Sequence, residues 1–170
     1  LGNGNWRGDI HFTKDEDWAK WFESYTRFIL YYAKVAQDSE MDAFVFGLVF
    51  ATAARVQQER WTELIKKIRA VYKGPLVYAA NWDNVPRVVF WEQVDWIGVQ
   101  FFGPLSDKKE PTYQELVAGV KKHLKVYEDI AAKHKKPLNF TEFGFRSTVA
   151  SFIKPYVWPS QLPEDFRGYD

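Results

Sequence analysis

Residues 43–81 decide the fold, and they read AFVFGLVFATAARVQQERWTELIKKIRAVYKGPLVYAAN. The stretch opens with a continuous apolar run, which is typical of a strand that is buried on both faces. An amphipathic pattern follows and predicts a helix that ends at the Gly-Pro pair of residues 74–75. A second apolar run predicts another strand. Strand, helix and strand in this order predict a βαβ unit and therefore a parallel sheet.

The same alternation continues on both sides of this unit. Strands are predicted at residues 43–50, 76–81, 96–102 and 137–143, helices at 13–37, 55–73 and 112–135, a short link at 86–94 and an irregular segment at 146–170. A Thr with a Glu three residues later predicts a capping box at two helix starts, Thr13 with Glu16 and Thr112 with Glu115. The expected fold class is α/β, with parallel strands that alternate with amphipathic helices.

Four such strands are too few for a closed (β/α)8 barrel, which takes about 250 residues. They would form half of a barrel or a small open sheet. We expect residues 1–170 to be a single partial barrel domain. The sequence begins with Leu1 and shows no signal-peptide pattern, so we expect a fragment of a longer barrel and assign no compartment. The rest of the barrel would come from another segment or chain.

The composition argues against several classes of function. Lys and Arg number 23 and Asp and Glu 22, a net charge of +1, so we expect neither a nucleic acid partner nor a membrane partner. Cysteine is absent, which excludes disulfides and a cysteine nucleophile. His11, His123 and His134 are scattered, and we expect no metal and no cofactor. Aromatic residues make up 18% of the chain, which suits a core but also the flat walls of a sugar-binding cleft.

Polar residues at the predicted strand ends are the first candidates for a site, because barrel active sites lie at the carboxyl ends of the strands. Glu142 stands in the last predicted strand. A carboxylate there is costly to bury, so it is either paired structurally or used chemically. Asn81 and Trp82 combine a polar donor with a flat apolar face, as a sugar site needs, although Asn81 also suits a turn.

Several spaced motifs resemble glycoside hydrolase family 113, the β-mannanase-like (β/α)8 enzymes with two catalytic glutamates. They are WRGDI at 6–10, DWAKWFESY at 17–25, the helix at 61–74, YAANW at 78–82, FW at 90–91, DWIGV at 95–99, PLS at 104–106, KP at 136–137 and TEFGFRS at 141–147. The resemblance runs from the loop after the third strand to just past the seventh. It implies a partial TIM barrel that lacks the first three strands and the last.

The resemblance also implies a carbohydrate ligand, a β-linked mannan-type polysaccharide or oligosaccharide. It places Glu142 at the nucleophile of a retaining mechanism, in which a carboxylate attacks the anomeric carbon. The residues that fall on or near the walls of the implied cleft are Asn81, Trp82, Trp6, Arg7, Phe102 and Trp158. Near the end of the sixth strand the family has a tyrosine, where this chain has Phe101-Phe102 and so lacks a hydroxyl that could contact the nucleophile.

One departure from the family pattern bears on activity. The family's Gly-Thr-Glu-Leu motif carries the acid/base glutamate, and this chain has Gly47-Leu48-Val49-Phe50, so Val49 takes the acid/base position. General acid–base catalysis contributes about 10²–10⁴-fold to a rate. Three interpretations stay open: an active retaining glycosidase with its acid/base supplied elsewhere, a catalytically impaired carbohydrate-binding or structural relative, and an unrelated α/β domain with a chance Thr-Glu-Phe-Gly.

Overall fold

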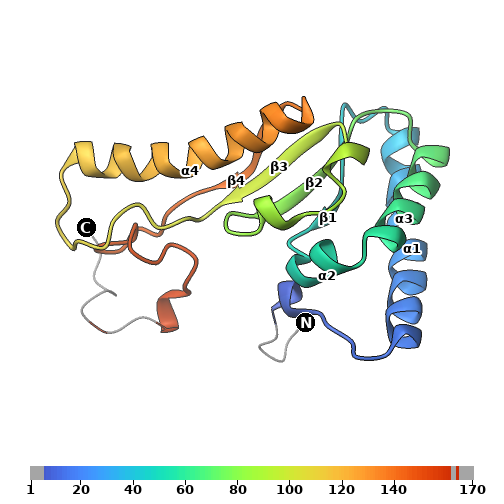
Figure 1. The fold of residues 1–170 in the computed structure, drawn as a ribbon, viewed down its shortest axis with the longest axis horizontal. Coiled ribbons are helices and arrows are strands. Elements are labelled where there is room, and N and C mark those ends of the chain that lie inside the picture. The colour runs from blue at the N-terminus through green and yellow to red at the C-terminus, as the bar shows by residue number, and fades with distance from the viewer. Residues whose placement is uncertain (1–5, 162–163, 165–170) are drawn as a thin grey trace.

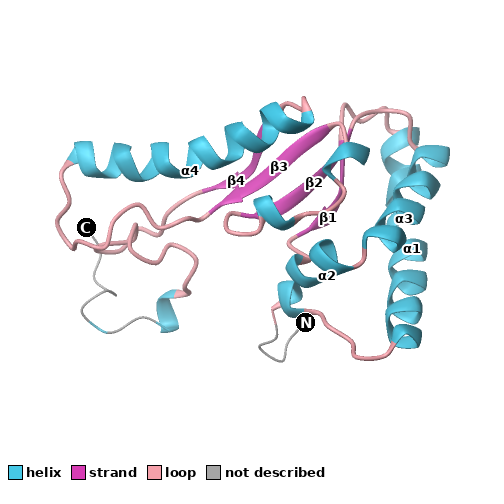
Figure 2. Ribbon diagram, in the orientation of Figure 1, coloured by secondary structure: helices cyan, strands magenta, loops and turns pink. Residues whose placement is uncertain are grey.

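A single parallel sheet forms the centre of the molecule (Figures 1 and 2). The structure is a computed structural model that describes residues 6–161 and residue 164. The strands are β1 (Phe44–Leu48), β2 (Leu76–Asn81), β3 (Trp96–Phe101) and β4 (Leu138–Phe143), in the order β1-β2-β3-β4. Every neighbouring pair is parallel, which confirms the predicted α/β class.

Helices cover one face of the sheet, and three of the four α-helices lie between consecutive strands along the chain. The α-helices are α1 (Asp15–Asp38), α2 (Ala51–Val56), α3 (Gln58–Val71) and α4 (Tyr113–His134), with 3-10 turns η1 (Arg7–Asp9), η2 (Val85–Arg87), η3 (Trp91–Gln93) and η4 (Pro159–Gln161). Helices α1 and α3 pack against each other beside β1, and α4 runs along the β4 side of the sheet (Figure 1).

Two details of the predicted helices are wrong. The helix predicted at 55–73 begins in the wrong place, because its first two residues are the end of α2 (Ala51–Val56) and Gln57 leaves the helical conformation before α3 (φ −116°, ψ 49°). The predicted capping box of Thr13 does not form, because α1 begins at Asp15 with Lys14 as its N-cap and no side-chain cap bond. Three acidic residues occupy the first turn of α1 instead, where negative charge interacts favourably with the helix dipole.

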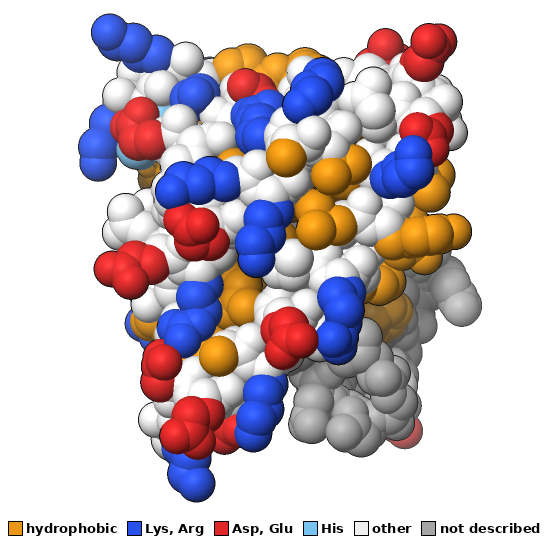
Figure 3. Space-filling model, turned by 90° about the vertical axis from the view of Figure 1, so that its right-hand side faces the viewer, with side chains coloured by type: hydrophobic (Ala, Val, Ile, Leu, Met, Phe, Trp, Pro, Cys, Tyr) orange, Lys and Arg blue, Asp and Glu red, His pale blue; other side chains and the backbone are white. Residues whose placement is uncertain are grey.

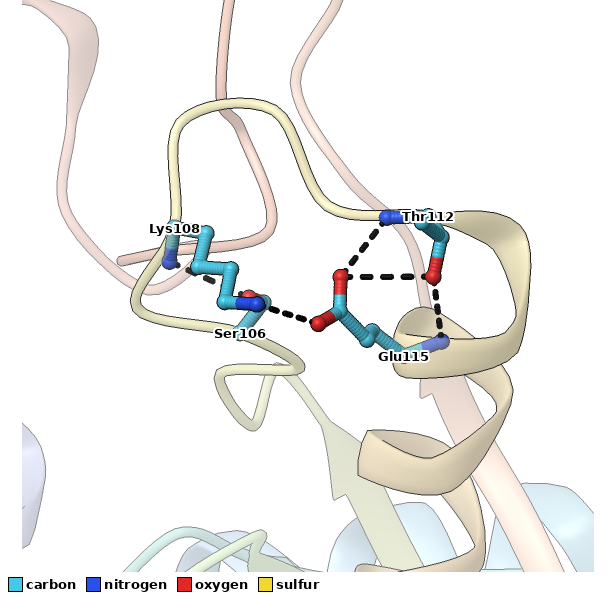
Figure 4. Close-up of polar contacts among 4 residues, drawn as sticks. All are labelled: Ser106, Lys108, Thr112 and Glu115. Carbon is cyan, nitrogen blue, oxygen red and sulfur yellow. Dashed lines mark hydrogen bonds and ion pairs between the residues drawn. The ribbon is translucent and has the colours of Figure 1, made fainter.

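The second predicted capping box is confirmed at the start of α4 (Figure 4). The Glu115 backbone N–H donates to Thr112 Oγ1 over 3.2 Å, and the Thr112 N–H donates to Glu115 Oε2 over 2.8 Å. Lys108 forms an ion pair with the same carboxylate, and its own backbone N–H donates to Ser106 Oγ. The hydrogen bonds that the Glu115 carboxylate accepts from Lys108 and from Thr112 lower its pKa, and they link the loop between β3 and α4 to the start of the helix.

The two faces of the sheet differ in character. Alternate residues of β2, Leu76, Tyr78 and Ala80, belong to the hydrophobic core that the helices cover. Trp61 of α3 is fully buried at its centre, with its ring 5.3 Å from that of Phe22 on α1. The opposite face of β2 carries Val77 and Ala79, which lie outside that core cluster, and it ends in the polar Asn81.

Helix α4 approaches the loop after β3 so closely that only glycine fits at one position. A Cβ added at Gly119 would lie 2.1 Å from the Leu105 carbonyl oxygen. We expect Gly119→Ala to destabilise the protein by about 1–3 kcal/mol through overpacking, although alanine in a helix is favoured over glycine by about 1 kcal/mol. Thermal unfolding measures the change. Gly144→Ala is the matched control, because the nearest atom there is 4.0 Å away; equal melting temperatures for both variants would contradict the expectation.

Candidate functional site

Three polar side chains stand side by side at the carboxyl end of the sheet. Asn81 of β2 pairs in register with Gln100 of β3, and Gln100 pairs with Glu142 of β4. Residues in register point to the same face of a sheet. Their strand neighbours Ala80 and Phe101 belong to the helix-covered core, so the three polar residues lie on the opposite face. We call Asn81, Gln100 and Glu142 the polar row.

An irregularity in β4 decides which way Glu142 points. Phe140 pairs with Val99, but Glu142 pairs with the next residue, Gln100, so Thr141 is an extra residue in the ladder. Such a bulge re-aims the side chains that follow it. Without it, Glu142 would stand opposite Phe101 and face the helices. The bulge therefore brings the carboxylate into the polar row, and it leaves Phe143 stacked on Phe101, with ring centroids 5.7 Å apart.

Glu142 is exposed and hydrogen-bonded, not buried in an ion pair. The Gln100 side-chain amide donates to Glu142 Oε1. Gln100 itself is only 6% exposed, so a buried donor holds an exposed carboxylate. At the other end of the row, Asn81 Nδ2 donates to Asp83 Oδ1 over 2.6 Å. Gln100 is not among the predicted site residues, although a single amide inside the apolar strand WIGVQF is an available signal.

Val49 directly follows β1, at the same carboxyl end of the sheet as this row. Its backbone N–H donates to the Ala79 carbonyl oxygen over 2.9 Å, and its side chain is 4% exposed. Its φ of 57° is left-handed, which is unusual and strained for a β-branched residue. The next N–H, that of Phe50, donates to the Tyr78 hydroxyl over 3.0 Å, and burial raises the pKa of this phenol. Backbone contacts thus hold Val49 in a conformation that valine disfavours.

An aromatic wall, which we define as Trp82 and Tyr156, follows directly after Asn81. The two rings stack with their centroids 5.8 Å apart and their planes 25° from parallel. The His123 ring packs edge-on against Trp82, and the Tyr127 hydroxyl donates to the Trp82 carbonyl oxygen over 2.9 Å. Tyr156 is 51% exposed. Tyr156 is not among the predicted site residues, because it lies in the irregular segment, where no periodic pattern marks individual residues.

Arg146 holds the loop that carries Tyr156. Its Nη1 donates to the carbonyl oxygens of Lys154, Pro155 and Val157. Burial lowers the pKa of the guanidinium from its usual value. Since Arg146 follows β4 closely, this side chain connects the strand that bears Glu142 to the segment that completes the aromatic wall.

The other predicted site residues lie in separate places. Phe102 directly follows β3, and its ring is the nearest group to Gly144. Trp6 (44% exposed) and Arg7 lie at η1, which packs against α2, and Trp158 is 74% exposed. Within residues 6–161 and 164, neither Trp6 nor Trp158 makes a ring contact. The structure therefore brings Asn81, Glu142 and Val49 to one edge of the sheet, and shows no contact that joins Trp6 or Trp158 to them.

A groove of about 700 Å³ lies between α1 and α3, away from the strand ends. Figure 3 shows this side of the molecule, where positive and negative side chains are interspersed with hydrophobic ones. None of the predicted site residues lines this groove.

In the described part of the chain, no group of three or more His, Asp or Glu could hold a metal ion. No described helix is long and apolar enough to cross a membrane.

Comparison with known proteins gives one family. The model of Glycoside Hydrolase Family 113 matches residues 1–167. A GH113 β-1,4-mannanase, solved as a complex, has a TM-score of 0.80 at 28% identity, and the match covers 96% of this chain and 50% of that one. The GH113 β-mannanase AaManA from Alicyclobacillus acidocaldarius, in complex with ManMIm, has a TM-score of 0.81 at 29% identity, with coverage of 95% and 49%. Among curated proteins, none matches.

The chain spans about half the length of these solved relatives, which are similar to it over almost all of its own residues. The four parallel strands therefore correspond to part of a larger fold of the same kind. The family match extends over nearly the whole sequence and includes all three residues of the polar row. The chain belongs to Glycoside Hydrolase Family 113.

Proposed function

We propose that the protein acts on β-linked mannan-type polysaccharides or oligosaccharides, with Glu142 as the nucleophile of a retaining mechanism and Val49 in the place of the acid/base. One observation carries this proposal. The bulge at Thr141 turns the Glu142 carboxylate away from the helix-covered core and into the polar row at the carboxyl end of a parallel sheet. This edge is where barrel enzymes place their reacting groups. The solved relatives named as β-mannanases support the choice of mannan.

In the proposed reaction a carboxylate oxygen of Glu142 forms a bond to the anomeric carbon, and the bond from that carbon to the glycosidic oxygen breaks. The leaving oxygen takes the electron pair and needs a proton, and water must later release the sugar from the enzyme. A retaining enzyme uses a second carboxyl group, about 5–5.5 Å from the first, for both proton transfers. Val49 can do neither, so both steps are slow for an ordinary glycoside.

The aromatic wall and Asn81 would bind the sugar. Sugar rings have apolar faces that pack on flat aromatic surfaces, and the exposed ring of Tyr156 extends the surface of Trp82. Asn81 supplies amide groups for hydroxyls next to that surface. A place on the cleft wall stays a prediction for four further residues, Phe102, Trp6, Arg7 and Trp158.

Further strands of the barrel would complete the cleft. Helix α1 exposes a run of large hydrophobic side chains beside β1, the first strand of the sheet, namely Phe28, Tyr31, Tyr32 and Val35. An exposed apolar patch of this kind marks a contact surface, and the solved relatives are twice as long as this chain. We propose that the rest of the barrel, on another segment or chain, packs there. A folded monomer of 20.0 kDa, shown by intact mass and sedimentation, would contradict this.

An activated aryl β-mannoside tests the proposed function, because its leaving group departs without protonation. The protein should release a burst of the phenol and retain a covalent sugar on Glu142, which peptide mapping by mass spectrometry locates. A protein that binds mannooligosaccharides but never takes the label would be a carbohydrate-binding relative instead. The buried Val49 favours this second candidate, since it removes the acid/base from the proposed position. A protein that neither binds mannooligosaccharides nor takes the label would refute both candidate functions.

A further inference from the structure

We propose that Gln100 is a positioning residue for Glu142: its buried amide holds one carboxylate oxygen and leaves the other free to react. This inference rests on the proposed role of Glu142 as the nucleophile. Within the described residues, Gln100 is the only hydrogen-bond donor to the Glu142 side chain. Nothing in the sequence patterns or in the family match assigns a role to Gln100.

The two partners differ in how firmly the fold holds them. Gln100 is 6% exposed on β3, an inner strand whose ladder contacts both β2 and β4. Glu142 is exposed on β4, which pairs with β3 alone in the described sheet. An exposed glutamate otherwise moves among several rotamers. The bond from a fixed, buried donor selects one of them, so the reactive geometry comes from Gln100.

The chemistry of the amide suits this task. A lysine or arginine at position 100 would place a positive charge beside the Glu142 carboxylate. That charge would make the carboxylate a weaker nucleophile toward the anomeric carbon. The Gln100 amide donates a hydrogen bond without a charge, and it does not ionise, so it takes no proton from Glu142. Because the register pairs Gln100 with Glu142 only through the Thr141 bulge, the donor and the bulge act together to aim the carboxylate.

Labelling kinetics with the activated aryl mannoside separate positioning from a structural role. Gln100→Met removes the donor at nearly constant shape, and Gln100→Leu removes it with a branched apolar side chain. We expect the maximal labelling rate to fall by about 10- to 100-fold, the value of a hydrogen bond to a charged group, while the concentration for half-maximal labelling stays within about threefold. Gln93→Met is the matched control, because Gln93 also donates to a side chain, Thr62 Oγ1, but on the helix side. It should leave labelling unchanged.

Two results would overturn the inference: an unchanged labelling rate in either folded Gln100 variant, or a parallel fall in rate, affinity and melting temperature. If the wild-type protein takes no label, the proposed function fails. An NMR measurement then tests separately whether Gln100 contacts Glu142. The side-chain amide resonances of Gln100 should shift in Glu142→Gln and stay in place in Glu128→Gln, which changes an exposed glutamate of α4. If the Gln100 side-chain amide resonances are unchanged in Glu142→Gln, the hydrogen bond between the two side chains is refuted.

Discussion

Val49→Glu should raise hydrolysis of unactivated β-mannan by about 10²–10⁴-fold, the range that general acid–base catalysis contributes. The new carboxyl group would stand at the end of β1, on the edge of the sheet that also carries the polar row. Burial at a position that is 4% exposed in the wild type would raise the pKa of the new group, as a general acid requires. Reducing-sugar release from mannan measures the gain.

The same variant should gain little in the first burst on an activated aryl mannoside, because that leaving group needs no proton. Its steady-state rate should still rise, since the new carboxylate can activate the water that releases the sugar. Val56→Glu is the matched control: it makes the same chemical change at an exposed position of α2. An unchanged rate on mannan in a folded Val49→Glu variant that binds mannan would show that Val49 does not face the glycosidic oxygen.

Glu142→Gln should abolish covalent labelling, because an amide oxygen does not form the stable glycosyl ester that a carboxylate forms. The shape of the side chain changes little, so sugar binding should persist. Intact mass after incubation with the activated mannoside measures the label, and calorimetric titration with mannooligosaccharides measures binding.

Glu128→Gln supplies the control, since Glu128 is an exposed glutamate on α4. It should take the label as the wild type does. If Glu142→Gln still takes the label, another side chain is the nucleophile, and peptide mapping would then identify it. If Glu142→Gln loses both label and sugar binding, Glu142 contributes to binding as well, and the labelled peptide of the wild type then identifies the attacking residue.

The strands and long helices could be predicted because each has a strong local pattern. The second strand, predicted at 76–81, forms as β2 over Leu76–Asn81, and the pattern of Thr112 and Glu115 specifies a capping box that the structure contains. The break at Gln57 could not be predicted, because the apolar periodicity of the two helices runs across it. Local patterns thus identify elements well and their interruptions poorly.

The candidate site was predictable only in part. Asn81, Val49 and Glu142 stand at strand ends, and parallel strands bring their carboxyl ends to one edge. The direction of Glu142 depends on the bulge at Thr141, and a register shift arises from pairing with another strand, which no local pattern records. Tyr156 reaches Trp82 through a loop that Arg146 holds, a contact across 74 residues of sequence (156 − 82) that periodicity cannot reveal.

The left-handed backbone at Val49 has an evolutionary consequence. The Ala79 carbonyl and the Tyr78 hydroxyl accept hydrogen bonds from the main-chain N–H groups of Val49 and Phe50, so the contacts that hold this conformation do not involve the Val49 side chain. Valine and glutamate codons can differ by a single base. On the role proposed for this position, a glutamate there would meet a main chain that is already held in place, so one mutation, and not a rebuilt active site, would supply the acid/base.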